Sequence, residues 1–320
     1  MKLQTQIPFT RAQNQIGYES QLLILGSCFA ENIGDKLDYF KFQSLQNPFG
    51  ILFHPLAIEK LISKAVKSEI YSEKDIFFLN ERWHCFDSHS DLSNSSKKEL
   101  LEELNSGLEK TYQQITKATH VLITLGTAWV YQNIETDTVV TNCHKVPQKE
   151  FSKELLSTEE IQNSLENAIQ CVQSVNQNAK FIFTVSPVRH LKDGFVENQR
   201  SKAHLISAIH QIMETSYFLP RTSYFESYEL VMDELRDYRF YEADMIHPNQ
   251  IAIDYIWEKF KEVWISLTAY TTMEKVDTVQ KGLQHRPYNP DSGQHQSFMK
   301  SLERKITYLQ EEYPFMKFEH

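Results

Sequence analysis

Short apolar runs recur along the chain at intervals that suit buried strands. Residues 22–25 (LLIL), 120–126 (HVLITLG) and 180–187 (KFIFTVSP) are rich in leucine, β-branched and aromatic residues, and Gly or Pro closes each run. Residues 222–228 (TSYFESY) form a weaker run of the same kind. The pattern predicts three strands and a fourth, less regular one.

Helical periodicity separates these runs. Apolar residues three and four positions apart, at Phe29, Ile33 and Leu37, follow the first run. Similar spacing over residues 97–117 and 157–175 precedes the next two runs. Strands that alternate with helices predict an α/β protein whose parallel sheet is covered by helices on both faces.

Two internal segments depart from this alternation. Residues 66–96 mix polar and aromatic residues around a Ser-rich patch, which predicts an excursion or a lid. Residues 132–155 have strand composition that stops at Pro147, which predicts a hairpin or a long loop. Loops of this length in compact domains usually carry function.

The last part of the chain is expected to be helical. Residues 247–264 predict a helix with Pro248 at or near its first turn. Two further helical patterns follow, separated by the Pro- and Asn-rich residues 285–293. We therefore expect an α/β domain over residues 1–265 and a helical extension over residues 266–320.

Composition narrows the class of protein. The chain has 320 residues, 41% hydrophobic content and a formal net charge of -9, so it can bury a sizeable core but offers no basic excess for nucleic acid. It has no continuous apolar leader and no run of about 18 apolar residues, so we expect a soluble, cytoplasmic protein with no membrane partner. Its four cysteines form no Cys-x-x-Cys pair and are expected to be free thiols. Its oligomeric state is left open.

Chemically capable residues follow the predicted strands. Ser27 comes after the first strand, Gly126 and Thr127 after the second, and residues 186–190 after the third, while residues 243–250 lie just before the last α/β helix. Ligands of open parallel sheets bind beyond the carboxyl ends of the strands. We expect these four segments to meet on one rim.

Asp244 and His247 have the spacing of an acid/base pair. Three positions apart on a turn, the carboxylate can orient the imidazole and stabilise its charged form. If the imidazole reaches Ser27, the hydroxyl can lose its proton as it attacks an acyl carbon. The predicted reaction class is acyl transfer.

Each of these residues has a plainer interpretation. Ser27 can simply cap the following helix, and Asp244 or His247 can cap the helix that Pro248 opens. Cys28 is a rival nucleophile, because a thiol at a helix N-terminus can have a lowered pKa. Adjacent helical residues diverge by about 100°, however, so we expect Ser27 to face the rim and Cys28 to pack against the sheet.

Several separated blocks together resemble the GSCFA family, which belongs with the SGNH/GDSL-type hydrolases. The resemblance covers roughly residues 5–260 and implies a three-layer, flavodoxin-like fold. The blocks are GSCFA at 26–30, NPFGILFHP at 47–55, LGTAWVY at 125–131, NCHKVP at 142–147, SPVRH at 186–190, SKAHL at 201–205 and DMIHP at 244–248.

The resemblance implies roles for individual residues. Ser27 matches the nucleophile, His247 the general base and Asp244 the carboxylate that orients the base. Gly50 matches a backbone donor of the oxyanion hole. The relatives' third donor is an Asn in Gly-x-Asn-Asp, but this chain has Gly126-Thr127-Ala128-Trp129. Gly126 and Thr127 are therefore the candidates there, with Asn142 from the long loop as an alternative.

Other polar residues are candidates for substrate contacts. Arg189 and His190 suit an anionic or hydroxyl-rich substrate, although a solvated surface pair is equally consistent with their sequence. Asn142 and His144 are candidates to line the pocket, or are ordinary hairpin residues. Six His and Cys residues lack regular zinc-ligand spacing, so no metal site is expected: His54, His84, Cys85, His89, Cys143 and His144.

Together these features predict an SGNH-like serine esterase that needs no cofactor. Its expected substrate is a small O-acyl ester, such as acetate on a carbohydrate, cleaved through an acyl-serine intermediate. Transfer of the acyl group to an acceptor other than water is an alternative. A second alternative is a non-catalytic module that binds a small molecule or a protein, because the oxyanion hole of this chain departs from the family pattern.

Overall fold

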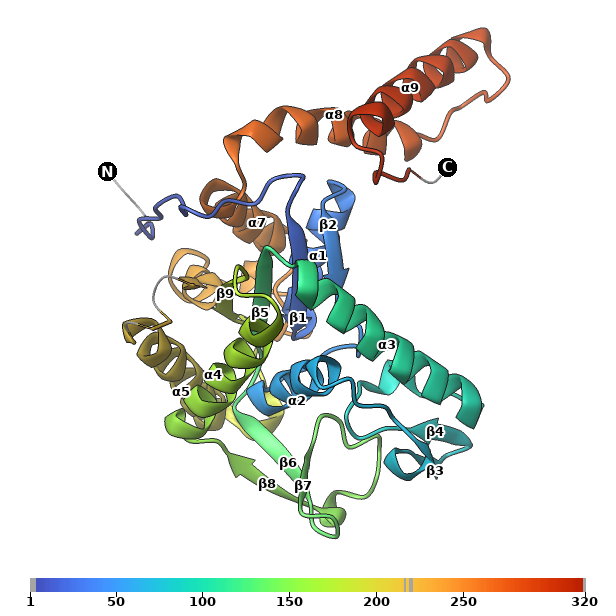
Figure 1. Cartoon of the computed structure of the whole chain (residues 1–320). Coiled ribbons are helices and arrows are strands. Elements are labelled where there is room, and N and C mark those ends of the chain that lie inside the picture. The colour runs from blue at the N-terminus through green and yellow to red at the C-terminus, as the bar shows by residue number, and fades with distance from the viewer. Residues whose placement is uncertain (1–3, 216, 219–220, 319–320) are drawn as a thin grey trace.

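The computed structural model describes residues 4–215, 217–218 and 221–318, so the outermost residues of both predicted domains, 1–3 and 319–320, lie outside it. A parallel five-stranded sheet forms its centre (Figure 1). In spatial order the strands are β10 (Thr222–Phe225), β9 (Lys180–Val185), β5 (His120–Leu125), β1 (Gln21–Gly26) and β2 (Gln43–Gln46).

Four of these strands confirm the predicted apolar runs, and β2 was missed. β2 has the sequence Gln-Ser-Leu-Gln, and all four of its residues are partly exposed at the edge of the sheet. An edge strand needs no continuous apolar run, because one of its sides has no neighbouring strand. The hydrophobic pattern therefore gave no signal for it.

Alternate strand residues face two different cores. Leu22 and Ile24 pack into one apolar cluster, and Leu23 and Leu25 into another. The first cluster lies under helices α1 (Cys28–Tyr39) and α7 (Gln250–Trp264). The second lies under α2 (Pro55–Val66), α3 (Lys97–Lys117), α4 (Thr158–Val175) and α5 (Phe195–Glu214). The predicted α/β fold with helices on both faces is confirmed.

The strand order reverses beside β1. The chain passes from β1 to β2 on one side, and from β5 through β9 to β10 on the other. Loops after two strands that diverge in this way leave a crevice at the carboxyl ends of the strands. Ser27 follows β1 and Gly126 follows β5, so both lie at this switch point.

Two excursions interrupt the alternation of strands and helices: one lies between α2 and α3, and the other follows β5. The 66–96 segment holds an antiparallel hairpin of β3 (Phe77–Leu79) and β4 (Arg82–His84). The 132–155 segment belongs to a three-stranded antiparallel sheet in the order β7 (Thr138–Val140), β6 (Trp129–Asn133) and β8 (Phe151–Leu155). Figure 1 shows this small sheet at the opposite end of the molecule from the C-terminal helices.

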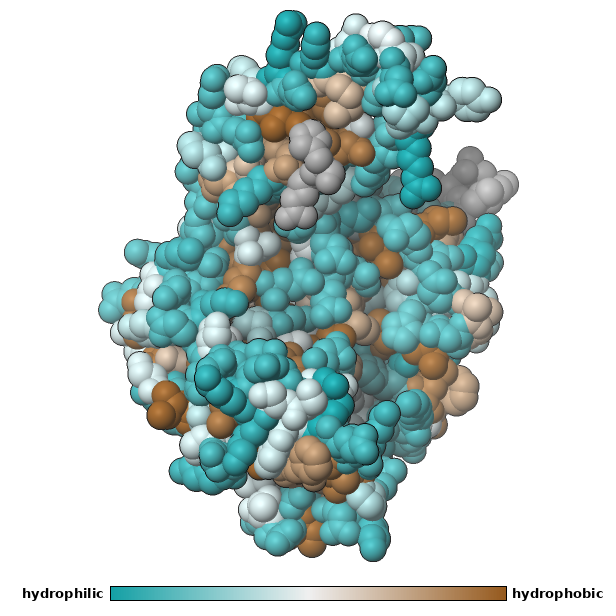
Figure 2. All heavy atoms as spheres, turned by 90° about the vertical axis from the view of Figure 1, so that its right-hand side faces the viewer, coloured by the Kyte–Doolittle hydropathy of each residue, from teal (hydrophilic) through white to brown (hydrophobic). Residues whose placement is uncertain are grey.

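The predicted helical tail is confirmed as α8 (Leu267–Leu283) and α9 (Gly293–Glu312). The two helices pack closely, since a Cβ atom on Gly282 would lie 2.6 Å from Leu302 Cδ1. Apolar residues gather on this part of the surface in Figure 2. None of the helices in the described part of the chain has the length and apolar character of a membrane-spanning segment. The division into domains at residue 265 stays a prediction.

Candidate active site

Ser27 occupies a sharp turn between β1 and α1. Gly26 has φ 139°, and a Cβ atom there would lie 2.2 Å from the carbonyl oxygen of Thr124, so only glycine fits this bend. Ser27 is the N-cap of α1, and its Oγ accepts a hydrogen bond from Phe29 N at 3.3 Å. The hydroxyl proton has no acceptor among the described residues. The capping role is thus real, and it leaves the proton of Ser27 available.

The Ser27 side chain is fully buried beneath the segment that follows β2. Asn47 Oδ1 accepts a hydrogen bond from Gly26 N at 2.9 Å, and Leu52 N donates to Gly26 O at 2.9 Å. These bonds fasten the segment to the end of β1. Ser27 thus lies at the carboxyl end of β1, as predicted, but its side chain is covered, so a ligand reaches the hydroxyl only if this segment or a neighbouring loop moves.

Cys28 does not show the features of a rival nucleophile. Its side chain is partly buried and packs at the border of the core under α1, as expected. Burial, followed by the nearby Glu31 carboxylate, raises the pKa of the thiol. The alternative of a helix terminus that lowers this pKa is wrong.

The predicted oxyanion donors already have acceptors. Thr127 Oγ1 is also engaged, because it accepts from Trp129 N at 3.0 Å and pairs with Ser201 Oγ at 3.1 Å. The backbone N–H groups of Ser27, Gly50, Gly126 and Thr127 each donate to a protein carbonyl, so none of the four is free to bind an oxyanion in this structure. The bonds are Ser27 N to Thr124 O (3.0 Å), Gly50 N to Asn47 O (2.8 Å), Gly126 N to Phe53 O (2.8 Å) and Thr127 N to Phe53 O (3.1 Å).

Asp244 and His247 form a hydrogen-bonded pair on an exposed turn. His247 Nδ1 lies 2.6 Å from Asp244 Oδ2, and about half of each side chain is exposed. The backbone N–H of His247, then its imidazole and the N–H of Ile246, hold the pKa of Asp244 down to about 2. The carboxylate therefore stays ionised at any ordinary pH and orients the ring so that Nε2 points away from it.

Neither residue of this pair caps the next helix. Asn249 is the N-cap of α7, and its Oδ1 accepts from Ala252 N, so Pro248 precedes the helix and does not open its first turn. The alternative in which Asp244 or His247 serves as the cap is wrong.

Arg189 joins the Asp244–His247 turn to the loop after β9. Its backbone N donates to Ile246 O at 3.2 Å, and its Nη1 donates to Met245 O at 3.1 Å. His190 comes next in the chain, and the charge of His247 contributes to lowering its pKa. The turn is therefore docked against the loop that carries His190, although Ser27 Oγ and His247 form no hydrogen bond in the described structure.

His190 lies between this turn and Ser27. A Cβ atom on Gly126 would lie 3.3 Å from both Ser27 Cβ and His190 Nε2, so the two side chains flank the same glycine. His190 Nε2 is buried and has no hydrogen-bond partner among the described residues. Burial, then the charges of Lys202 and His247, lower the pKa of His190 to about 3. His190 is a neutral imidazole facing the site, and the solvated-surface alternative is wrong for it.

Comparison with known families agrees with this architecture. The sequence model of the GSCFA family matches residues 21–260. The chain belongs to the GSCFA family. The C-terminal domain of GSCFA domain proteins matches residues 276–320, which hold the last part of α8 and all of α9. No curated protein matches the chain.

Lys202 is a residue of this GSCFA site that sequence reasoning missed. It lies on α5 in the SKAHL block, is 1% exposed, and donates to Gly126 O at 2.7 Å and Ser186 O at 2.6 Å. No carboxylate pairs with it among the described residues. Burial lowers its pKa to about 7. In the sequence, a lysine in an amphipathic helix looks like a surface residue. Only its position in the SKAHL block, one of the segments that resemble the GSCFA family, indicated a role in the site.

Asn47 is a second residue of the GSCFA site that received no role. Its amide is bonded to Gly26, the residue before Ser27, and its Nδ2 lies 3.3 Å from Glu31 Oε1. Amide side chains beside the nucleophile are the kind of donor that an oxyanion hole uses. Asn47 opens the NPFGILFHP block, so its position was visible, but only the packing of β2 against β1 brings it to Ser27.

Asn142 and His144 lie in a separate part of the GSCFA domain. Asn142 Oδ1 accepts from His144 N at 2.8 Å, and His144 Nε2 bonds to Cys85 O at 2.6 Å. Neither forms a hydrogen bond with Ser27 in the described structure, so their predicted role in substrate binding finds no support there. Among the described residues, no group of three His, Cys, Asp or Glu side chains is arranged to hold a metal ion.

Proposed function

We propose that this GSCFA protein is a serine esterase or acyltransferase that acts on a small O-acyl ester, such as acetate carried by a carbohydrate. One observation carries the proposal. The Asp244–His247 pair is docked, through Arg189, on the loop whose His190 flanks the same glycine as Ser27. These contacts support a site in which the oriented imidazole of His247 approaches Ser27 beside the neutral imidazole of His190 when the turn closes.

In the proposed reaction, Ser27 Oγ attacks the acyl carbon while His247 Nε2 takes the hydroxyl proton. The bond to the leaving alcohol breaks, and His247 returns the proton to that alcohol. Water or an acceptor hydroxyl then gives a proton to His247 and attacks the acyl carbon. The bond between the acyl carbon and Ser27 Oγ breaks, and His247 passes the proton to Ser27 Oγ, which restores both residues. Because Ser27 and His247 are not hydrogen-bonded in the unliganded structure, the exposed turn has to close when substrate binds.

His190 is the donor we propose for the developing oxyanion. The backbone donors suggested by the sequence are already bonded, whereas His190 Nε2 is buried beside Ser27 and unpartnered. A neutral imidazole with its proton on Nε2 can donate to an oxyanion without carrying a charge into the site. Lys202 acts behind it as a positioning residue, because it bonds the carbonyls of Gly126 and Ser186 and its charge disfavours protonation of His190.

The test is covalent labelling of Ser27 with a fluorophosphonate probe, together with hydrolysis of p-nitrophenyl acetate. We expect label on Ser27 in the wild type, none in Ser27→Ala, and full activity in Cys28→Ala as the matched control. His247→Asn and His190→Leu should each lower kcat/KM by about 10²–10³-fold, and His190→Gln, which keeps a donor, should recover part of it. Equal hydrolysis by wild type and Ser27→Ala would refute the proposal.

A non-catalytic binding module is the second candidate, and one observation favours it. Ser27 is fully buried and the N–H groups around it are all bonded, which suits a rigid scaffold. This candidate predicts no probe label at Ser27 at any pH or ligand concentration, with unchanged ligand binding in Ser27→Ala.

A further inference from the structure

A groove of about 350 Å³ lies beside the Asp244–His247 turn, and its lining combines cations with aromatic rings. Arg189 and Arg236 supply the cations, and Phe195, Tyr238 and Tyr241 supply the rings. The chain as a whole is acidic, with a formal net charge of -9, so the positive charge of two arginines in one groove contrasts with the net charge of the protein.

Neither arginine is neutralised by a carboxylate in the described structure. The one acidic side chain of the lining, Asp237, is bonded to Arg239 at 3.0 Å. Arg189 uses one N–H on Met245 O, which leaves its other donors without a protein acceptor among the described residues. An arginine with free donors in a groove suits a carboxylate, which it binds through two parallel hydrogen bonds.

The aromatic rings surround the same guanidinium. The central carbon of Arg189 lies 5.6 Å from the ring centre of Phe195, 5.9 Å from that of Tyr238 and 5.7 Å from that of Tyr241. Phe195 is 65% exposed and Tyr238 is 61% exposed, so both rings offer apolar faces to solvent. The hydroxyls of Tyr238 and Tyr241 have no partner among the described residues. Exposed rings with free hydroxyls suit a ligand that is apolar on its face and polar at its edge.

We propose that this groove binds a sugar ring that carries a carboxylate, as in a uronic acid, with the carboxylate on Arg189 and the C–H face of the ring on the tyrosines. The two hydrogen bonds from Arg189 to residues 245 and 246 place the groove directly beside the His247 turn. The inference rests on the proposed function for its biological meaning, because it names the carrier of the ester. The binding itself is independent of Ser27.

The test is a titration of the full-length protein with methyl β-D-glucuronide, methyl β-D-glucoside and acetate, followed by calorimetry or ligand-detected NMR. We expect the glucuronide to bind at least about tenfold more tightly than either of the other two. Arg189→Met and Tyr241→Ala should each weaken glucuronide binding about tenfold or more. Arg236→Met, at an exposed lining position, provides a second variant that does not disturb the turn.

The controls separate this inference from the enzymatic proposal. Arg286→Met removes an exposed arginine outside the groove lining and should bind like the wild type, as should Ser27→Ala. Equal affinity for glucuronide and glucoside, equal affinity for acetate and glucuronide, or unchanged binding in Arg189→Met would each overturn the inference. Glucuronide binding without Ser27 labelling would leave a binding module, whereas labelling without glucuronide binding would leave an esterase with another carrier.

Discussion

The environment of Lys202 illustrates what single residues do at this site. A buried ammonium group without a carboxylate partner is costly, and here two backbone carbonyls are its only hydrogen-bond acceptors in the described structure. Those carbonyls belong to Gly126 and Ser186, which follow β5 and β9. The lysine therefore links two of the loops that form the candidate site, and its burial lowers the stability of the fold.

This cost predicts a pH dependence. Burial lowers the pKa of Lys202 from its ordinary 10.5 to about 7. Between these values the unfolded chain holds a proton that the folded chain has released, so the free energy of unfolding rises with pH across this window, by about 1.4 kcal/mol per pH unit. Urea denaturation at pH 7.5 and 9.5 should show this rise in the wild type and in Lys110→Met, an exposed control, but not in Lys202→Met. Identical pH slopes in all three would contradict it.

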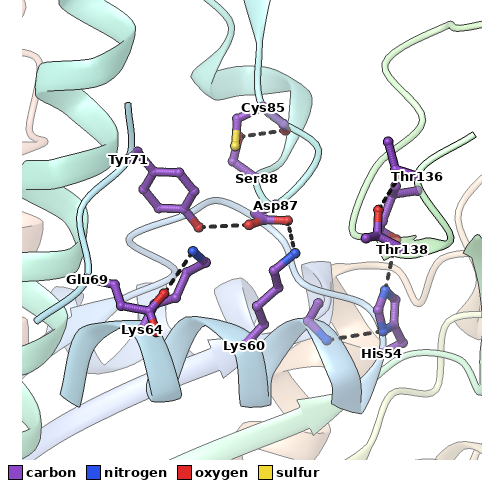
Figure 3. A network of polar contacts seen from close by, with 12 residues as sticks. His54, Lys60, Lys64, Glu69, Tyr71, Cys85, Asp87, Ser88, Thr136 and Thr138 are labelled. Atoms are coloured by element: carbon purple, nitrogen blue, oxygen red, sulfur yellow. Dashed lines mark hydrogen bonds and ion pairs between the residues drawn. The ribbon is translucent and has the colours of Figure 1, made fainter. Parts of the chain in front are cut away.

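At the scale of elements, a polar network fastens the 66–96 excursion to α2. Lys60 Nζ, on the helix, lies 2.5 Å from Asp87 Oδ1, and Tyr71 donates to Asp87 Oδ2 at 3.1 Å (Figure 3). Tyr71 is 3% exposed, and burial, then the Asp87 carboxylate, raises the pKa of its hydroxyl. Since the excursion ends beside the segment that covers Ser27, through a bond from His89 N to Phe49 O, this network helps to hold that cover in place.

Replacing the shared carboxylate should loosen the excursion. In Asp87→Ala, Lys60 and the buried Tyr71 hydroxyl lose their common acceptor, and we expect a loss of about 1–3 kcal/mol in the free energy of unfolding. Limited proteolysis should also cleave residues 66–96 faster. Glu73→Gln, which breaks the exposed pair between this excursion and Lys97 at the start of α3, is the matched control and should cost less than about 1 kcal/mol. Equal effects of the two variants would show that the network is not important for the excursion.

At the scale of the whole molecule, buried neutral histidines are spread over several elements. His54 caps α2, His120 begins β5, His144 lies in the long loop and His190 lies at the candidate site. Burial lowers the pKa of all four, to about 4 for His54 and His144 and to about 3 for His190. Each stays neutral in the folded protein at pH values where an unfolded histidine takes up a proton.

The protein should therefore lose stability in mild acid. Below about pH 6.5 these histidines are protonated in the unfolded state but stay neutral in the folded state. The free energy of unfolding therefore falls as pH falls, by up to about 1.4 kcal/mol per pH unit for each histidine. Chemical denaturation at pH 7.5, 6 and 5 measures this slope. His54→Gln should reduce this slope by the equivalent of about one bound proton. His285→Gln, at an exposed position, should leave the slope unchanged. A slope that His54→Gln does not alter would exclude His54 as a contributor.

The sequence alone determined the central layers of this protein. The apolar runs and helical spacings predicted β1, β5, β9, β10 and the helices α1, α3, α4 and α7, because burial on a sheet or a helix face imposes a period that is visible in one dimension. β2, α2 and α5 were not predicted. The polar edge strand β2 and the less amphipathic helix α5 carry a weaker period, whereas α2 has a regular apolar face, with Ile58, Leu61 and Ile62 buried, that was visible in the sequence and was not used.

The tertiary structure decided how the candidate site is arranged. The Ser27 elbow and the Asp244–His247 spacing were visible in the sequence, because both are local. That Ser27 is buried, that its predicted backbone donors are already bonded, and that His190 and Lys202 lie beside it depend on contacts between strands far apart in the chain. Burial and hydrogen-bond partners depend on residues that are distant in the sequence and become neighbours only when the sheet forms, so the sequence does not show them.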